Sequence, residues 1–155
     1  MVDFSDLLRP EAVFAGLAVV SRKALMGQLG TLGAPLVGID PRVIADALSE
    51  RERLGSTGFG GGVAIPHARL AELTTPVGLF VRLAQPIEFD AVDDIPVDLV
   101  FALLSPAPGG TEHLKALARV SRQLRDRQFL GKLRGAGSRD ALYALFTADD
   151  ARHAA

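Results

Sequence analysis

The residues of this chain most suited to chemistry lie between Arg51 and Arg69, where a histidine follows a glycine-rich loop. Four of the five residues 58–62 are glycine, which adopts positive φ at little cost, so this backbone can approach a ligand closely. Pro66 disfavours a helical conformation for the residue before it, which predicts an extended segment leading into His67. An imidazole beside loop amides, hydroxyls and arginines suits an anion, most often phosphate. The candidate phosphate-binding residues are Ser56, Thr57, Gly58 and Gly62, with His67 as the reactive side chain.

Two further side chains are candidates for the same site. His113 lies in the first turn of a predicted helix that starts near Thr111, and the N–H groups and partial positive charge of a helix start favour an anion. Arg51 ends an earlier helix, and its guanidinium matches two phosphate oxygens. Each candidate also has a plain structural interpretation. His67 would be a polar strand end, His113 an exposed residue near a cap, and Arg51 a solvated cation at a helix C-terminus.

Other kinds of site fit the sequence less well. The glycine-rich loop lacks the lysine and Ser/Thr of a P-loop, and Val-Ala-Ile-Pro follows it in place of a helix. Nothing at metal-ligand spacing supports a zinc site, and the Gly-x-Ser-x-Gly elbow of a serine hydrolase is missing. Asp93 and Asp94 are most simply a turn, and the mixed-charge run 50–53 a solvated helix end. We therefore expect no metal and no cofactor.

The elements that must position these residues alternate between strands and helices. Extended segments or strands are predicted over 12–17, 63–66, 77–83 and 97–104, the last suited to the centre of a sheet because it is almost entirely apolar. Helices are predicted over 22 to about 32, 41–53, 112 to about 125, 127–133 and 139–146, capped by Ser21, Asp40, Thr111, Asp126 and Ser138. On the third helix, the inner side is assigned to Leu114, Leu117, Ala118 and Ser121. This alternation predicts an α/β sandwich with helices on the sheet faces.

Length and composition limit the classes of protein that remain. At 155 residues, one domain is expected over 1–155, with a core over about 7–146 and a frayed tail over 147–155. A net charge of −1 provides no basic field for nucleic acid, and the apolar runs are far shorter than the roughly 20 residues of a membrane helix. The absence of cysteine excludes disulfides and thiolate catalysis, and without a signal peptide at its start the chain is expected to be cytoplasmic.

Taken together, these motifs resemble the type-2 IIA proteins of the bacterial phosphotransferase system, the fructose/mannitol class, and especially its stand-alone nitrogen-regulatory branch. The resemblance covers about residues 7–146, and the Ser-Thr-Gly loop followed by Ile-Pro-His is its most specific part. The matching segments are Arg51-Glu-x-x-Gly-Ser-Thr-Gly-x-Gly60, Val63-Ala-Ile-Pro-His67, Pro86-Ile-x-Phe-Asp90, Pro96-Val-Asp-Leu-Val-Phe-Ala-Leu-Leu104 and His113-Leu. The resemblance implies a mixed central β-sheet flanked by helices on both faces.

The resemblance also implies an activity and partners. His67 would receive a phosphoryl group from a phosphohistidine carrier of the HPr kind, with Arg51 near the phosphate and His113 as the second histidine of the site. The expected targets are regulatory proteins, such as potassium-transport or sensor-kinase regulators. Two alternatives stay open: a sugar-specific IIA component that passes phosphate to a IIB domain, and a regulatory binding module. In the second, phosphate would act as a charge switch of about −1.5 to −2.

Overall fold

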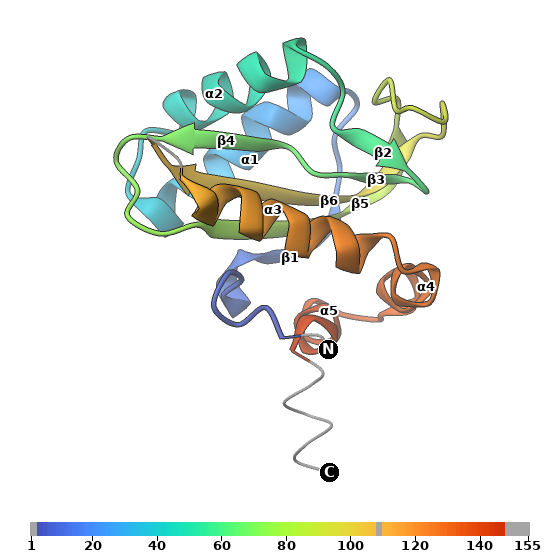
Figure 1. Ribbon diagram of the computed structural model, residues 1–155. Coiled ribbons are helices and arrows are strands. Elements are labelled where there is room, and N and C mark those ends of the chain that lie inside the picture. Colours follow the sequence, from blue (N-terminus) through green and yellow to red (C-terminus); the bar gives the residue numbers. More distant parts are fainter. Residues whose placement is uncertain (1–2, 108–109, 148–155) are drawn as a thin grey trace.

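The structure is a computed structural model that describes residues 3–107 and 110–147 (Figure 1). Strands and helices are interleaved along the chain in groups, with five consecutive strands between a pair of helices and three C-terminal helices. In chain order the elements are η1 (Pro10–Ala12), β1 (Val13–Leu17), α1 (Arg22–Val37), α2 (Pro41–Arg53), β2 (Gly58–Gly60), β3 (Val63–Ala64), β4 (His67–Leu70), β5 (Val77–Ile87), β6 (Val97–Pro106), α3 (Thr111–Leu124), α4 (Arg127–Gly135) and α5 (Arg139–Phe146).

One six-stranded sheet organises the described residues, and β6 lies at its centre. The strand order is β1-β5-β6-β3-β2, and β4 pairs with β6 farther along the same edge as β3. β1 is parallel to β5, and both β3 and β4 are parallel to β6, whereas the β5–β6 and β2–β3 pairs are antiparallel. The sheet is therefore mixed, as expected, and β6 has the central position that its apolar sequence predicts.

Helices cover both faces of this sheet because successive residues of a strand point to opposite sides. On β6, Phe101 and Leu103 belong to the core cluster that includes buried residues of α3, α4 and α5. Val100 and Ala102 belong to the cluster that includes buried residues of α1 and α2. Figure 1 shows the same division, with α1 and α2 above the sheet and the three C-terminal helices below it. The predicted α/β fold with helices on both faces is confirmed.

Helix starts follow the predicted capping residues with one exception. The side chains of Ser21, Asp40, Asp126 and Ser138 each accept a hydrogen bond from a backbone N–H in the first turn of the helix that follows. The prediction that Thr111 caps α3 is wrong, because Gly110 occupies the N-cap position and no side chain bonds there. Thr111 is instead the first residue of the helix.

The inner face of α3 also differs from the prediction. Leu114, Leu117, Ala118 and Ser121 do not form the buried side, and Leu114 is 60% exposed. The buried residues are His113, Ala116, Val120 and Leu124, which recur at helical spacing on another face. The prediction followed the leucines, but Ala116 and Val120 are small enough for the helix to lie close to the sheet, and only Leu117 packs partly against that core.

Several elements are longer or more numerous than predicted. α1 continues through Pro35 to Val37 and ends at Gly38, which has a φ of 69° and donates its N–H to the carbonyl of Ala34. β5 runs on to Ile87, and the short strands β2 and β4 were not predicted. Apart from Thr147, the tail predicted to be frayed lies outside the described residues.

Candidate functional site

His67 is the first residue of β4, where the chain resumes pairing with β6 after Pro66. Its half-buried side chain turns back on its own backbone, with Nδ1 2.8 Å from the carbonyl oxygen of Ile65. A carbonyl oxygen only accepts hydrogen bonds, so Nδ1 carries the ring hydrogen in the neutral form. The lone pair of neutral His67 is therefore on Nε2, the nitrogen available to a partner.

Arg51 approaches this same Nε2 from the last turn of α2. Its Nε–H donates to Nε2 of His67 over 3.2 Å, which agrees with the tautomer set by Ile65. A second nitrogen, Nη1, donates to the carbonyl oxygen of Gly55 over 3.0 Å. The guanidinium is therefore held between the end of its own helix and the imidazole, and the structure brings Arg51 to His67 as expected.

His113 lies on the other side of the site, in the first turn of α3, with its ring centroid 5.5 Å from that of His67. The interpretation of this histidine as an exposed cap residue is wrong, because it is only 5% exposed. Its Nδ1 lies 2.7 Å from Oγ of Ser105, a residue near the end of β6 that is fully buried. The hydrogen bond to Ser105 uses Nδ1 of the ring, so Nε2 is the polar atom that remains for another partner.

The two histidines and Arg51 border one hollow of about 370 Å³. Its walls come from α2, β4 and α3, three elements that are far apart in the sequence and meet only in the fold. The lining residues are Ala47, Glu50, Arg51, His67, Ala68, Arg69 and His113. Two guanidinium groups and two imidazoles face this space against one carboxylate, so the hollow suits a small anion.

Both imidazoles are held toward their neutral forms. Burial is the main cause that lowers the pKa of His67, the guanidinium groups of Arg51 and Arg69 add to it, and the hydrogen bond to Ile65 acts in the opposite sense. Burial also lowers the pKa of His113, followed by the effects of His67 and Arg69. A neutral His67 with its lone pair on Nε2 is the form of histidine that can act as a nucleophile once that lone pair is released by Arg51.

The four expected phosphate-binding residues do not line this hollow. Ser56 Oγ donates to the carbonyl of Phe89 over 2.8 Å and accepts from the N–H of Gly58. Thr57 donates its N–H and its hydroxyl to the carboxylate of Glu52. The described contacts of these hydroxyls therefore anchor the loop itself. Gly58 lies against Ala91 and Phe89, so a Cβ there would be crowded by protein atoms.

The remaining glycines of the loop shape a turn. Gly60, Gly61 and Gly62 have φ values of 113°, 69° and 80°, and they connect β2 to β3. This is the left-handed region in which other residues are strained. Gly62 also packs against Arg134 and Asp98. Three of the four loop glycines therefore use the conformational freedom noted in the sequence, whereas the expected backbone contact with phosphate remains a prediction.

Two residues important to the site were missed in the sequence. Glu52 was assigned to a solvated helix end, but it is 6% exposed and binds Thr57. The sequence contains a signal for this burial, since Glu52 follows Ile44 and Leu48 at intervals of four residues and so lies on the same inner face of α2. Ser105 was missed because it directly follows the strand predicted over 97–104 and was assigned to the loop after it, but a single hydroxyl at the end of an apolar run is a reason to look for a buried partner.

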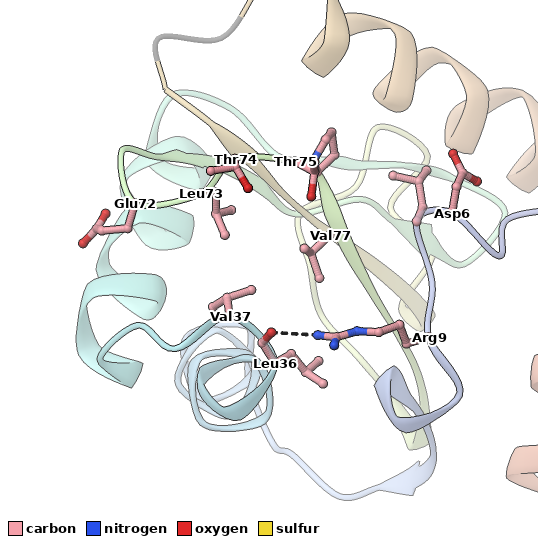
Figure 2. Close-up of a pocket in the computed structure, with 11 residues that line it drawn as sticks. Asp6, Arg9, Leu36, Val37, Glu72, Leu73, Thr74, Thr75 and Val77 are labelled. Atoms are coloured by element: carbon pink, nitrogen blue, oxygen red, sulfur yellow. Dashed lines mark hydrogen bonds between the residues drawn. The ribbon is translucent and has the colours of Figure 1, made fainter.

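A second hollow of about 400 Å³ lies away from these histidines (Figure 2). In this hollow, Arg9 donates a 2.7 Å hydrogen bond to the carbonyl of Leu36, and Asp6 and Glu72 supply carboxylates. Neither a histidine nor a second arginine lines it, so it fits an anion less well than the His67 hollow.

Two negative observations apply to the part of the chain that the structure describes. No group of three or more His, Cys, Asp and Glu side chains is placed there to hold a metal ion. None of its helices combines the length and the apolar character needed to cross a bilayer.

Comparison with known proteins gives consistent matches over most of the chain. Residues 6–149 match the profile of the family described as "Phosphoenolpyruvate-dependent sugar phosphotransferase system, EIIA 2". A nitrogen regulatory protein of Bradyrhizobium diazoefficiens is 45% identical over 91% of this chain and 92% of its own length. A nitrogen regulatory protein of Escherichia coli is 40% identical over 94% of this chain and 90% of its own length. The crystal structure of nitrogen regulatory protein IIA-Ntr from Neisseria meningitidis superposes with a TM-score of 0.86 at 33% identity, covering 92% of this chain and 97% of that one.

Proposed function

Because this chain belongs to the EIIA 2 family of the phosphoenolpyruvate-dependent sugar phosphotransferase system, we propose that Nε2 of His67 accepts a phosphoryl group from a phosphohistidine carrier of the HPr kind. The chain would then act as a phosphotransferase of a relay and signal to regulatory partners. The observation that carries this proposal is the pair of hydrogen bonds on His67. Ile65 holds the hydrogen on Nδ1, and Arg51 marks the lone pair on Nε2.

The bonds that form and break in the transfer step involve only the phosphoryl group and the two imidazoles. The Nε2 lone pair of His67 forms a bond to phosphorus while the phosphorus–nitrogen bond to the carrier breaks, and that bonding pair returns to the carrier's imidazole. The His67 ring gains positive character as it bonds phosphorus. The hydrogen bond from Nδ1–H to the Ile65 carbonyl oxygen, 2.8 Å between heavy atoms, stabilises this positive charge.

Arg51 has two tasks in this mechanism. Before transfer, its Nε–H bonds to the lone pair on Nε2 of His67. As the carrier arrives, this N–H must move from that nitrogen to a phosphoryl oxygen.

Arg69 lines the same hollow and adds a second positive charge to it. His113 presents Nε2 to the hollow and would donate a hydrogen bond to another phosphoryl oxygen. Catalysis would then consist of positioning and charge stabilisation.

The outer face of α3 offers a docking surface for the carrier beside this hollow. Leu114, which follows His113, is largely exposed, and a groove along the helix is lined by Leu117, Arg122 and Arg125, among others. An apolar centre with a cationic edge next to a reacting histidine suits a protein that brings its own phosphohistidine.

A regulatory role is favoured over sugar transport by the relatives that match most of the chain, which are named as nitrogen regulatory proteins. The targets would be proteins such as potassium-transport or sensor-kinase regulators, in the cytoplasm. Phosphorylation would change the charge of the contact face by about −1.5 to −2. No nucleic acid, membrane insertion or cofactor enters this proposal.

The test is phosphorylation of the purified protein. We expect incubation with phosphoenolpyruvate, enzyme I and an HPr-type carrier to add the mass of one phosphoryl group, measured under alkaline conditions that preserve phosphohistidine. His67→Ala should add none, and His113→Ala should be labelled more slowly. The control is His153→Ala, at the third histidine of the chain and within the tail expected to be frayed, which should behave as wild type. Full labelling of His67→Ala would remove this residue from the central role, and no labelling of the wild type by active carriers would reject the relay.

Two further assays separate the alternatives. Passage of the label to a IIB domain of a fructose or mannitol transporter would support the sugar-specific role, and failure to pass it would favour regulation. Binding of a candidate partner should differ between His67→Ala and His67→Asp, which introduces a negative charge. Equal binding by both variants and by the phosphorylated protein would reject the charge switch.

A further inference from the structure

Ser105 is a polar residue in a position where the sheet is otherwise apolar. It follows Leu103 and Leu104 near the end of β6, and all three residues are fully buried. Its hydroxyl lies 2.7 Å from Nδ1 of His113, whose side chain is buried as well. A buried hydroxyl in a hydrogen bond to an active-site imidazole determines which way that ring faces.

A hydroxyl also suits an imidazole that changes its protonation state. When His113 is neutral, the Ser105 O–H can donate to Nδ1, which places the ring hydrogen on Nε2. When His113 is protonated, Nδ1–H can donate to the same Ser105 oxygen. Ser105 thus provides a partner in both states, whereas an apolar side chain would leave one buried N–H unpaired on protonation.

We propose that Ser105 is a positioning residue, which aims the Nε2–H of His113 into the hollow and remains hydrogen-bonded when His113 is neutral and when it is protonated. This inference rests on the proposed phosphoryl transfer to His67. Ser105 touches neither the hollow nor the reacting atoms, since it is absent from the lining residues. It would act only through His113.

The groups around His113 explain why its proton needs such control. From β4 it is faced by His67 and Arg69, and from α2 the same hollow is lined by Arg51 and Glu50. Burial, followed by the effects of His67 and Arg69, lowers the pKa of His113, so the resting ring is neutral and its tautomer decides whether Nε2 donates or accepts. A phosphoryl group on His67 would bring negative charge into the hollow and favour protonation.

The first test reads the tautomer without any phosphoryl transfer. Nitrogen-15 NMR of wild-type protein should show His113 with the hydrogen on Nε2 and a bare Nδ1. In Ser105→Ala, the two tautomers of His113 should mix, and in Ser105→Thr, which keeps a hydroxyl, the Nε2–H form should return. A wild-type His113 with its hydrogen on Nδ1, or a tautomer unchanged in Ser105→Ala, would overturn the inference.

The second test measures the rate of labelling from a phosphorylated HPr-type carrier. Ser105→Ala should be about three- to tenfold slower than wild type, the loss expected for one neutral hydrogen bond, while its thermal unfolding remains cooperative. In the His113→Ala background, Ser105→Ala should cause no further loss, because its only route of action is gone. An equal loss in both backgrounds would show a structural role and overturn the inference.

The two tests also separate this inference from the proposed function. If wild-type protein is not labelled at all, the proposed relay fails, while the NMR experiment still shows whether Ser105 sets the tautomer. If wild-type protein is labelled and Ser105→Ala is labelled at the same rate, the relay stands and the positioning role is rejected.

Discussion

The buried carboxylate of Glu52 should be essential to the stability of the loop beside the site. Glu52 follows Arg51 at the end of α2, and its two oxygens accept from the N–H and the hydroxyl of Thr57 over 2.8 and 2.5 Å. Nη1 of Arg22 lies 3.7 Å from the same carboxylate. The substitution Glu52→Gln keeps the shape of the side chain but replaces one accepting oxygen by an NH₂ group that only donates.

The expected cost follows from these contacts. Hydrogen bonds to a charged group contribute about 1.5–3 kcal/mol each, and Gln keeps one of the two with an uncharged acceptor. The loss of the long ion pair with the partly exposed Arg22 adds about 0–1 kcal/mol. We therefore expect Glu52→Gln to lower the free energy of unfolding by about 2–4 kcal/mol. For a chain of this size, that corresponds to a fall in Tm of roughly 4–16 °C.

The assay is denaturant and thermal unfolding followed by circular dichroism at pH 7. Glu50→Gln is the matched control for stability, because Glu50 lies two residues earlier on α2 and its ion pair with Arg53, at 3.6 Å, is exposed. We expect this control to stay within about 0.5 kcal/mol of wild type. Labelling of His67 should also slow in Glu52→Gln, because the end of the helix that holds Arg51 loses its anchor.

One result would refute this reasoning. If Glu52→Gln unfolds within about 0.5 kcal/mol of wild type, like the Glu50→Gln control, the Glu52–Thr57 contact does not hold the loop. A loss of stability with unchanged labelling would mean that the anchor does not act on Arg51.

Two other predictions concern packing and pH. A Cβ at Gly30 of α1 would overlap the carbonyl oxygen of Pro41, so Gly30→Ala should destabilise the protein by about 1–3 kcal/mol. A Cβ at Gly27 of the same helix would meet nothing within 4 Å, so Gly27→Ala should stabilise the protein by about 0.5–1 kcal/mol. Equal effects of the two substitutions in urea unfolding would contradict the close approach of α1 and α2. The lowered pKa of His113 means that the unfolded chain binds more protons than the folded one, so its contribution to stability is full above about pH 6.5 and is lost as the pH falls below that value. The decline of Tm between pH 7 and pH 5 should therefore be shallower in His113→Ala than in wild type, and an equal decline would show that the pKa is not lowered.

Local sequence signals predicted the helix starts well because the interactions involved span only a few residues. Ser21, Asp40, Asp126 and Ser138 each bond to an N–H two or three residues ahead, so the chain carries the information within one turn. The exception is instructive, since Thr111 has a capping side chain but Gly110 takes the cap position.

Burial on α3 shows what local signals cannot supply. Its sequence offers one stripe with Leu114 and Leu117 and another with Ala116 and Val120, and the choice depends on the shape of the sheet beneath. His113 belongs to the buried stripe with Ala116 and Val120, and from there it reaches Ser105. The same limit applies to Ser56 and Thr57, whose hydroxyls bind Phe89 and Glu52, two partners that the local sequence did not indicate.

The sequence by itself determined the α/β class and the extended approach to His67, because residue types and short spacings carry those signals. It named Arg51 and His113 only as candidates, from their residue types and their places at helix ends. The tertiary structure alone decided that α2, β4 and α3 meet in one hollow, which nitrogen of His67 carries the lone pair, and which neighbour each hydroxyl binds. Those outcomes depend on distances between atoms contributed by elements far apart in the chain. Such distances exist only once the sheet has formed and the helices have packed on its two faces.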